Sequence, residues 1–205
     1  RDIENIIKTR LYRLLAVDDD SMQYTKLREF LKNEFIPSFD EIVKNCKLNF
    51  KKDGLSFDSK INEEERTLSP SDFGFHNALR KDNGKIIFLD FEYFGWDDPA
   101  KMISDFVLHP GMDLKNELKK LFVEDLLATF KGNRNLKSRL NNVYQMIGLV
   151  WCLILLNEFI PQELLKRKFA SKNYLKDKKV QLNQLLKAKK LLQKINKEYK
   201  FPYFT

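Results

Sequence analysis

Two oxygen-bearing side chains flank the strongest hairpin signal in the chain. Asn83-Gly84 lies between two apolar runs, a pattern typical of a two-residue β-turn. If these two residues form the turn, pairing runs back along both strands until Asn77 lies directly opposite Asp90. An amide oxygen and a carboxylate that converge in this way suit a hard cation such as Mg²⁺. The spacing therefore predicts a magnesium site at the open end of the hairpin.

A further carboxylate lies just upstream. Asp72 precedes Asn77 by five positions, on the loop that enters the hairpin. A carboxylate within reach of a metal-bound phosphate can orient or deprotonate an attacking hydroxyl. Asn and Asp are also common at strand ends as turn formers and caps, so each residue taken alone has a structural alternative. Their joint placement favours chemistry, with Asp72 as the candidate base.

Other chemistries find less support in the residues. The seven glycines are spread too widely for a Gly-rich phosphate loop. No Gly-x-Ser-x-Gly elbow makes Ser69 or Ser71 a nucleophile. His76 and His109 lie far apart in the sequence, and neither has a Cys or Glu beside it at zinc spacing, so we expect no structural zinc.

The segment that follows Asp72 resembles a known family. Asp72, then Asn77, then Asp90-Phe91-Glu92-Tyr93 is similar to the catalytic segment of the aminoglycoside phosphotransferase and choline/ethanolamine kinase group, whose fold is protein-kinase-like. Asp98-Pro99 and Asp105-Phe106 resemble the Asp-Pro and Asp-Leu signals that follow it. The resemblance implies ATP as co-substrate, Asp72 as catalytic base, and Asn77 and Asp90 as Mg²⁺ ligands. It also implies that Asp105 supports the catalytic loop from the next helix.

The resemblance is incomplete in two places. Where the family commonly has His two residues before the catalytic Asp, this chain has Pro70, and His76 is the candidate to support the loop instead. Such kinases also hold ATP under a β-rich N-terminal lobe, and no strand-rich segment precedes the helical beginning of this chain. We therefore interpret the chain as the C-terminal lobe of a longer kinase. Its partner would be the missing N-terminal lobe of the same polypeptide, and we expect the isolated fragment to be inactive.

The expected acceptor is a hydroxyl on a cationic small molecule, an amino sugar or amino alcohol. The candidate residues that bind it are acids near the loop: Glu92, Asp97, Asp98 and Asp113. Phe94 and Trp96 either line a pocket for the cation or pack the loop after the hairpin. One alternative is a non-catalytic, degenerate kinase lobe that docks on a protein or nucleic acid. Another is a metal-dependent phosphohydrolase, which would need ligands for a second ion.

The elements that must position these residues are mostly helical. Apolar positions at three- and four-residue steps predict helices over 3–15, 21–35, 37–46, 114–130, 136–155 and 173–199. The helix over 136–155 is apolar nearly all round and should be the buried spine. The expected fold class is mainly α with a small β-hairpin, the C-terminal lobe of a protein-kinase-like (α+β) phosphotransferase. We expect one domain, 1–205, with a helical segment (1–46), a linking excursion (47–68), the catalytic loop and hairpin (69–105) and a helical remainder (106–205).

Charge and cysteine usage limit the compartment and the partners. The net charge is +8, and the stretch from Glu163 onward holds thirteen Lys or Arg against three acids. Arg and Gly are sparse there, so the pattern is more typical of a solvated helix face than of a nucleic-acid module.

The longest apolar run, 146–156, has about half the length that spans a bilayer, so we expect no membrane segment. Cys46 and Cys152 are expected as buried free thiols, which favours a cytoplasmic location.

Overall fold

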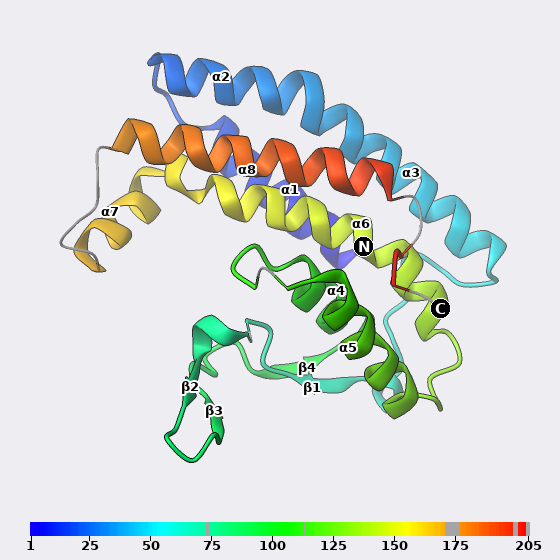
Figure 1. Cartoon of the computed structure of the whole chain (residues 1–205). Helices are drawn as coiled ribbons and strands as arrows, with labels where there is room; N and C mark the ends of the chain where they lie inside the picture. Colours follow the sequence, from blue (N-terminus) through cyan, green and yellow to red (C-terminus); the bar gives the residue numbers. More distant parts are fainter. Residues whose placement is uncertain (73, 113, 171–176, 199–200, 204–205) are drawn as a thin grey trace.

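Helices make up most of the structure, a computed structural model that describes residues 1–72, 74–112, 114–170, 177–198 and 201–203 (Figure 1). The α-helices are α1 (Asp2–Leu15), α2 (Met22–Phe30), α3 (Ile36–Lys52), α4 (Pro99–Leu108), α5 (Asn116–Thr129), α6 (Leu136–Leu155), α7 (Pro161–Ala170) and α8 (Asp177–Lys197). The strands are β1 (Thr67–Ser69), β2 (Ala78–Arg80), β3 (Ile86–Phe88) and β4 (Gly95–Asp97). This confirms the expected fold class, mainly helical with small antiparallel hairpins.

Helix α6 is the spine of the core, as its composition predicts. It packs against α1, α3, α4 and α8, and Leu140, Tyr144 and Ile147 are almost completely buried. A helix enclosed by neighbours on several sides must be apolar on several sides, because each burying contact removes nonpolar surface from water. Each fully buried Leu or Ile side chain contributes about 1.5–3 kcal/mol. Helices α1, α2, α3, α6 and α8 form the helical body, which holds most of the core.

By length and composition, one stretch among the described residues could cross a membrane, Leu136–Phe159. Its most apolar window is 72% buried inside the protein, as expected for a core helix. The stretch combines α6 with a short 3₁₀ turn, Leu156–Phe159. Cys152 on α6 and Cys46 on α3 are both buried free thiols, as predicted. Burial raises the pKa of the Cys46 thiol to about 12, which keeps it protonated and unreactive.

The first helices differ in detail from the prediction. Helices α2 and α3 follow one another directly through a π-helical turn, Leu31–Phe35, in which the Ile36 N–H donates to the Leu31 carbonyl. This wider turn leads into Pro37, whose missing N–H is tolerated in the first turn of α3. Helix α3 then runs six residues into the expected linking excursion, because Phe50 continues the apolar spacing and packs edge-on against Phe57. Helix α7 was not predicted at all.

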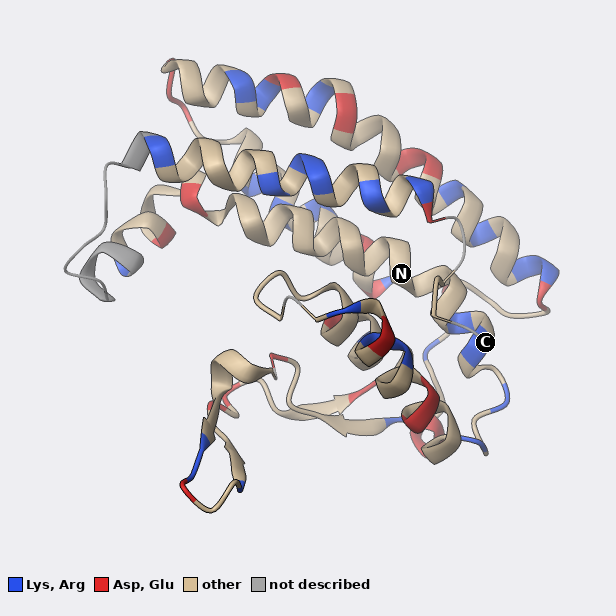
Figure 2. Cartoon of the chain, in the orientation of Figure 1, with Lys and Arg blue, Asp and Glu red and all other residues tan. Residues whose placement is uncertain are grey.

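The basic helix α8 is an integral part of the helical body. Its predicted first residues, 173–176, lie outside the described part of the chain. Leu185, Leu192 and Ile195 are buried, and the helix packs against α6 and α2. Lysines recur along it (Figure 2), and Lys187, Lys190 and Lys197 are exposed. Lys189 Nζ lies 2.7 Å from a carboxylate oxygen of Glu34 on the π-helical turn. The charge pattern therefore belongs to the solvated side of a packed helix.

Two short two-stranded sheets precede α4. Strands β1 and β4 pair antiparallel, with Ser69 opposite Gly95, and β2 and β3 form the hairpin, with Ala78 opposite Phe88. The hairpin projects away from the helices, while β1 and β4 lie beside α4 and α5 (Figure 1). Each strand has only three residues, the short end of the usual range. This region carries all three residues expected to perform the chemistry.

The hairpin forms where it was predicted, but in a different register. Lys81 pairs with Lys85 around a three-residue loop, and only Gly84 within that loop has a positive φ, +81°. A two-residue type I′ turn would need positive φ at Asn83 as well. The Lys85 N–H instead donates to the Asn83 side-chain oxygen at 3.1 Å. The register therefore differs by one residue, and the prediction that Asn77 pairs with Asp90 is wrong.

Candidate functional site

The loop that presents Asp72 has a strained backbone. The Asp72 N–H donates to the Pro70 carbonyl at 2.6 Å, which closes a three-residue γ-turn around Ser71. Ser71 has a φ of +59°, in a region that residues with a Cβ seldom occupy. Strain of this kind costs about 1–3 kcal/mol and persists only where surrounding contacts enforce it. Here it turns the residue expected to be the base out of the line of strand β1.

Serine hydrogen bonds hold this turn in place. The Ser69 hydroxyl oxygen accepts from the Ser71 N–H at 3.1 Å. The Ser71 hydroxyl donates to the Tyr93 carbonyl at 3.1 Å, which ties the Asp72 loop to the segment after the hairpin. Ser69 is completely buried and Ser71 half-buried. Neither serine lies in a nucleophile motif, and the hydrogen bonds show that both have a structural role in shaping the loop.

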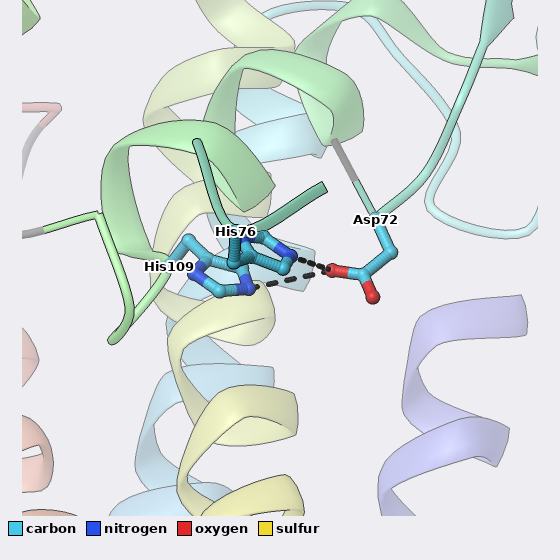
Figure 3. Close-up of side chains that lie close together, drawn as sticks. All are labelled: Asp72, His76 and His109. Atoms are coloured by element: carbon cyan, nitrogen blue, oxygen red, sulfur yellow. Dashed lines mark hydrogen bonds and ion pairs between the residues drawn. The ribbon is translucent and has the colours of Figure 1, made fainter. Parts of the chain in front are cut away.

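The Asp72 carboxylate meets two imidazole rings at a single oxygen (Figure 3). His76 Nε2 lies 3.1 Å from Asp72 Oδ1, and His109 Nε2 lies 3.3 Å from the same atom. The two rings stack at 4.3 Å between centroids, with 12° between their planes. Burial and the neighbouring His76 lower the pKa of His109 against the pull of Asp72, which favours the neutral ring.

Asn77 is held close to Asp72 through the backbone. Its side-chain amide nitrogen donates to the backbone carbonyl of Asp72 at 2.7 Å. The backbone carbonyl of Asn77 accepts from the Leu89 N–H at 2.8 Å. With the nitrogen used in this way, the side-chain oxygen is the atom left to bind a cation. That orientation suits an oxygen ligand for Mg²⁺.

Asp90 follows directly after the Asn77–Leu89 contact. It is exposed and has a φ of +61°, the second positive-φ position among the described non-glycine residues. A left-handed residue breaks the alternation of an extended strand, so its side chain does not follow the cross-strand pattern. Joint metal binding by Asn77 and Asp90 therefore stays a prediction. It now rests on their closeness in the hairpin and on the resemblance, since they are not a facing pair.

Asp98 and Asp97, expected to bind the acceptor, already have partners within the protein. Asp98 caps α4 by accepting from the Ala100 N–H at 2.8 Å, and it pairs with Arg139 Nε at 2.9 Å. Burial raises the pKa of Asp98 in spite of Arg139. Asp97 lies 2.7 Å from Lys101 Nζ. Both acids therefore have structural functions, whatever else they bind.

Asp105 supports the site through intermediates. Its carboxylate accepts from Lys101 Nζ at 3.0 Å and from Trp151 Nε1 at 3.1 Å. Burial raises the pKa of Asp105; burial also opposes the charge on Lys101, but Asp105 and Asp97 outweigh it and raise the pKa of Lys101. Trp151 in turn packs edge-on against His109, with 4.6 Å between the ring centroids. Asp105 is thus connected to the Asp72 loop by way of Trp151 and His109.

A pocket of about 600 Å³ lies beside β4 and the start of α4. Its lining includes Trp96, Asp97 and Asp98 but none of the three residues expected to perform the chemistry. Trp96 and Phe94 are 67% and 49% exposed, so they do not pack the loop as core residues would. Glu92 is exposed and hydrogen-bonded to the Tyr93 hydroxyl. Asp113 lies outside the described residues.

The sequence did not identify His109 as part of the site. His109 and His76 are brought together by α4, so their separation along the chain was a poor argument against a shared site. Among the described residues, the two histidines and Asp72 form a group whose potential ligand atoms all lie within 4.8 Å of one another. No local motif connects them, and the signal would have required the packing of α4 on the loop.

Comparison with known proteins identifies the fold. The chain is similar to the solved structure of an ethanolamine kinase from Plasmodium vivax, with a TM-score of 0.54 and 15% sequence identity over 93% of this chain. The matched region covers 50% of that kinase, so this chain spans about half of its length. No protein-family model matches the chain, and no curated protein matches it significantly. At this level of identity the likeness concerns architecture, and it shows that the chain has a kinase-like, mainly helical fold.

Proposed function

We propose that the chain is the C-terminal lobe of a kinase that transfers the γ-phosphate of ATP to a hydroxyl of a small molecule. The observation that carries the proposal is the Asp72 loop. Its carboxylate is presented by a strained turn, and the Asn77 side chain bonds back to that loop from five positions later. The same order of residues marks the catalytic segment of the family that the sequence resembles, and a solved ethanolamine kinase shares the fold.

In the proposed reaction, Asp72 acts on the acceptor. The acceptor oxygen forms a bond to the γ-phosphorus, the bond from that phosphorus to the β,γ-bridging oxygen breaks, and ADP leaves. The hydroxyl proton passes to Asp72. Asn77 and Asp90 offer the amide and carboxylate oxygens that Mg²⁺ prefers, and the ion would neutralise charge on the phosphates.

We propose a cationic amino alcohol or amino sugar as the acceptor. Exposed acidic and aromatic side chains near the reacting loop support this class, because carboxylates and ring faces both attract ammonium groups. Glu92 and the 63% exposed Tyr93 lie on the segment tied to Ser71, next to the Asp72 loop. Asp97 and Asp98 already pair with Lys101 and Arg139, so Glu92 is the acid best able to meet a new cation. Asp113 remains a further candidate.

A second lobe would cover an apolar surface around the hairpin. The side chains that form it are large and between 42% and 67% exposed: Leu68, Phe88, Leu89, Phe91, Tyr93, Phe94 and Trp96. Exposed apolar side chains that occur together in one region indicate a surface that another part of a protein covers. A β-rich N-terminal lobe of the same polypeptide fits, since the ethanolamine kinase with this fold is about twice as long.

The test uses a longer protein that includes the sequence upstream of Arg1. We expect Mg²⁺-dependent ADP release with an amino alcohol or amino sugar, and at least about a hundredfold lower kcat for Asp72→Asn, in the range usual for a lost general base. Asp82→Asn, an exposed acid in the hairpin loop, is the matched control and should keep full activity. Activity retained by Asp72→Asn would overturn the proposed role.

A second comparison tests the two-lobe interpretation. The 205-residue chain alone should bind ATP weakly and show almost no turnover, because phosphoryl transfer depends on positioning by both lobes. Equal turnover by the short and long proteins would contradict the proposal that this chain is one lobe. Activity restricted to neutral or acidic acceptors would contradict the proposed acceptor class.

A further inference from the structure

The hydrogen bonds of His109 determine which of its nitrogens carries the proton. His109 follows α4 directly, and its side chain is 13% exposed. Its Nδ1 lies 3.0 Å from the backbone nitrogen of Gly111, and a backbone N–H can only donate. Nδ1 must therefore carry a lone pair. In the neutral ring the proton is then on Nε2, the nitrogen that lies 3.3 Å from Asp72 Oδ1.

We infer that His109 is a positioning residue for Asp72, whose Nε2–H holds Oδ1 so that Oδ2 is free to accept the substrate proton. This inference rests on the proposed function. The loop lacks a histidine two residues before Asp72, where it has Pro70. His109 provides a supporting imidazole from a different element, the end of α4. Both described imidazole contacts are made with Oδ1, as Figure 3 shows.

The surroundings of His109 fix the direction of this N–H. Its ring stacks on that of His76 and packs in a T-shaped arrangement with that of Trp151, with centroids 4.6 Å apart. Trp151 is anchored in turn by Asp105, through the 3.1 Å bond from Nε1. Packing from α4 and α6 thus reaches Asp72 through a chain of contacts, although Asp72 itself lies on an exposed loop. A group held in this way loses little orientational freedom when substrate binds.

The same hydrogen bonds argue against a metal ion in this cluster. A histidine that binds a metal through one nitrogen usually donates its other N–H to an acceptor. For His109 to bind through Nε2, its proton would have to move to Nδ1, where it would face the Gly111 N–H. Support of a carboxylate fits the donor set better.

The tautomer can be measured on the 205-residue chain without any activity. In ¹⁵N–¹H correlation spectra at neutral pH, we expect His109 to show a protonated Nε2 and an unprotonated Nδ1, assigned by loss of the signals in His109→Gln. Asp72→Asn should perturb the His109 Nε2 signal. A protonated Nδ1 would overturn the inference. So would one equivalent of Zn²⁺ that shifts the signals of His76 and His109 together.

Two substitutions separate donation to Asp72 from packing. The amide of His109→Asn can replace Nδ1 as acceptor for Gly111 but does not reach Asp72, whereas that of His109→Gln can replace Nε2 as donor. In the longer kinase we expect His109→Asn to lower kcat by about 10- to 100-fold with KM unchanged. His109→Gln should recover most of this loss. Equal losses in both variants would mean that the ring only packs, and would overturn the inference.

The two proposals fail in distinguishable ways. If the longer wild-type protein has no kinase activity, the proposed function fails, and the positioning role fails with it, even though the tautomer spectra remain interpretable. If Asp72→Asn is inactive but His109→Asn is as active as wild type, the proposed function stands and the positioning role is wrong. A thermal melt of each variant shows whether it is folded; if His109→Asn is unfolded, activity in a folded His109→Phe comparable to wild type also overturns the inference.

Discussion

The helical body and the loop-and-hairpin region, 66–97, use their residues in opposite ways. The helical body buries most of its apolar positions around α6. Among the described residues of 66–97, only Ser69 and Gly74 are buried, while Phe91, Tyr93 and Trp96 are more than half exposed. The two described non-glycine residues with a positive φ, Ser71 and Asp90, also lie there. Stability is thus concentrated in one region, and strain and candidate chemistry in the other.

Hydrogen exchange should show the largest difference between the regions. The Leu89 N–H bonds to Asn77 across an exposed hairpin, whereas Ile147 lies in the middle of the buried helix α6. Opening free energies run from near zero in exposed segments to the global value of about 5–15 kcal/mol in the core. We therefore expect the Leu89 amide to exchange at least about a thousandfold faster. Equal protection would mean that the hairpin unfolds only with the core, and the comparison would fail.

A large loss of stability is expected for Arg139→Ala, because Arg139 ties the residues on either side of the loop-and-hairpin region, Glu65 and Asp98, to α6. From α6 it pairs with Asp98 at 2.9 Å, with Glu65 at 3.5 Å and with the Asn133 side-chain oxygen at 3.0 Å. The side chain of Arg139 is 9% exposed and that of Asp98 20%, so removing Arg139 leaves a largely enclosed carboxylate without its compensating charge, at a cost of about 3–5 kcal/mol. Urea unfolding measures this cost.

The control for Arg139→Ala is Arg134→Ala, an exposed arginine just before α6. It should change the free energy of unfolding by less than about 0.5 kcal/mol. Removing the opposing charge as well, in Arg139→Met with Asp98→Asn, should recover part of the loss. If Arg139→Ala is no less stable than Arg134→Ala, this ion-pair network contributes no stability where the loop-and-hairpin region is attached to α6.

The two regions also differ in how far the sequence predicts them. Apolar steps of three and four residues predicted α1, α5 and α6 closely, because a buried helix face requires that spacing. The hairpin was predicted from Asn83-Gly84, but its register depended on the backbone conformation of Asn83, which the amino-acid sequence alone does not specify. A change of one residue in the loop then altered every pair in the hairpin.

The site was predicted where its residues are close in sequence and missed where they are not. Asp72 and Asn77 lie on one short loop, so their spacing carried information. His109 reaches Asp72 only because α4 packs against the loop. Asp98 and Asp97 suggested ligand binding, but Asp98 pairs with Arg139 from the distant helix α6, and Asp97 pairs with Lys101 one helical turn further along the chain. Composition near a loop therefore overestimates how many of its charges are free.

A matched pair of Gly→Ala substitutions should produce an intermediate effect. At Gly148 on α6 a Cβ would lie 2.6 Å from Ile195 Cγ2 on α8, so Gly148→Ala should cost about 1–3 kcal/mol through overpacking. At Gly84 a Cβ meets no atom within 4 Å, but the φ of +81° strains alanine. Gly84→Ala should leave the melting temperature unchanged and speed exchange only within the hairpin. A lower melting temperature for Gly84→Ala would show that the hairpin belongs to the cooperative core.

The smallest effect concerns charge on the helical body. Glu4 on α1 pairs with Lys8 at 2.6 Å and with Lys47 on α3 at 3.3 Å. Burial would raise the pKa of Glu4, but the two lysines outweigh it and lower the pKa below its ordinary value of 4.5. A carboxyl whose pKa is lower in the folded state stabilises the protein above the unfolded-state pKa, and this stabilisation is lost as the pH falls through the folded-state value. Glu4→Gln should thus cost about 0.5 kcal/mol at pH 7, a value usual for a solvent-screened pair.

The difference between Glu4→Gln and wild type should therefore shrink as the pH falls from about 5 to about 3. Added salt should also reduce it at pH 7, because the lysines are about half exposed to solvent. Glu29→Gln, at an exposed position on α2, serves as the control for a simple change in net charge. A Glu4→Gln effect that grows in acid would have the wrong sign for this linkage. It would mean that Glu4 acts as a buried neutral group, so that electrostatics would oppose the packing of α1 on the helical body.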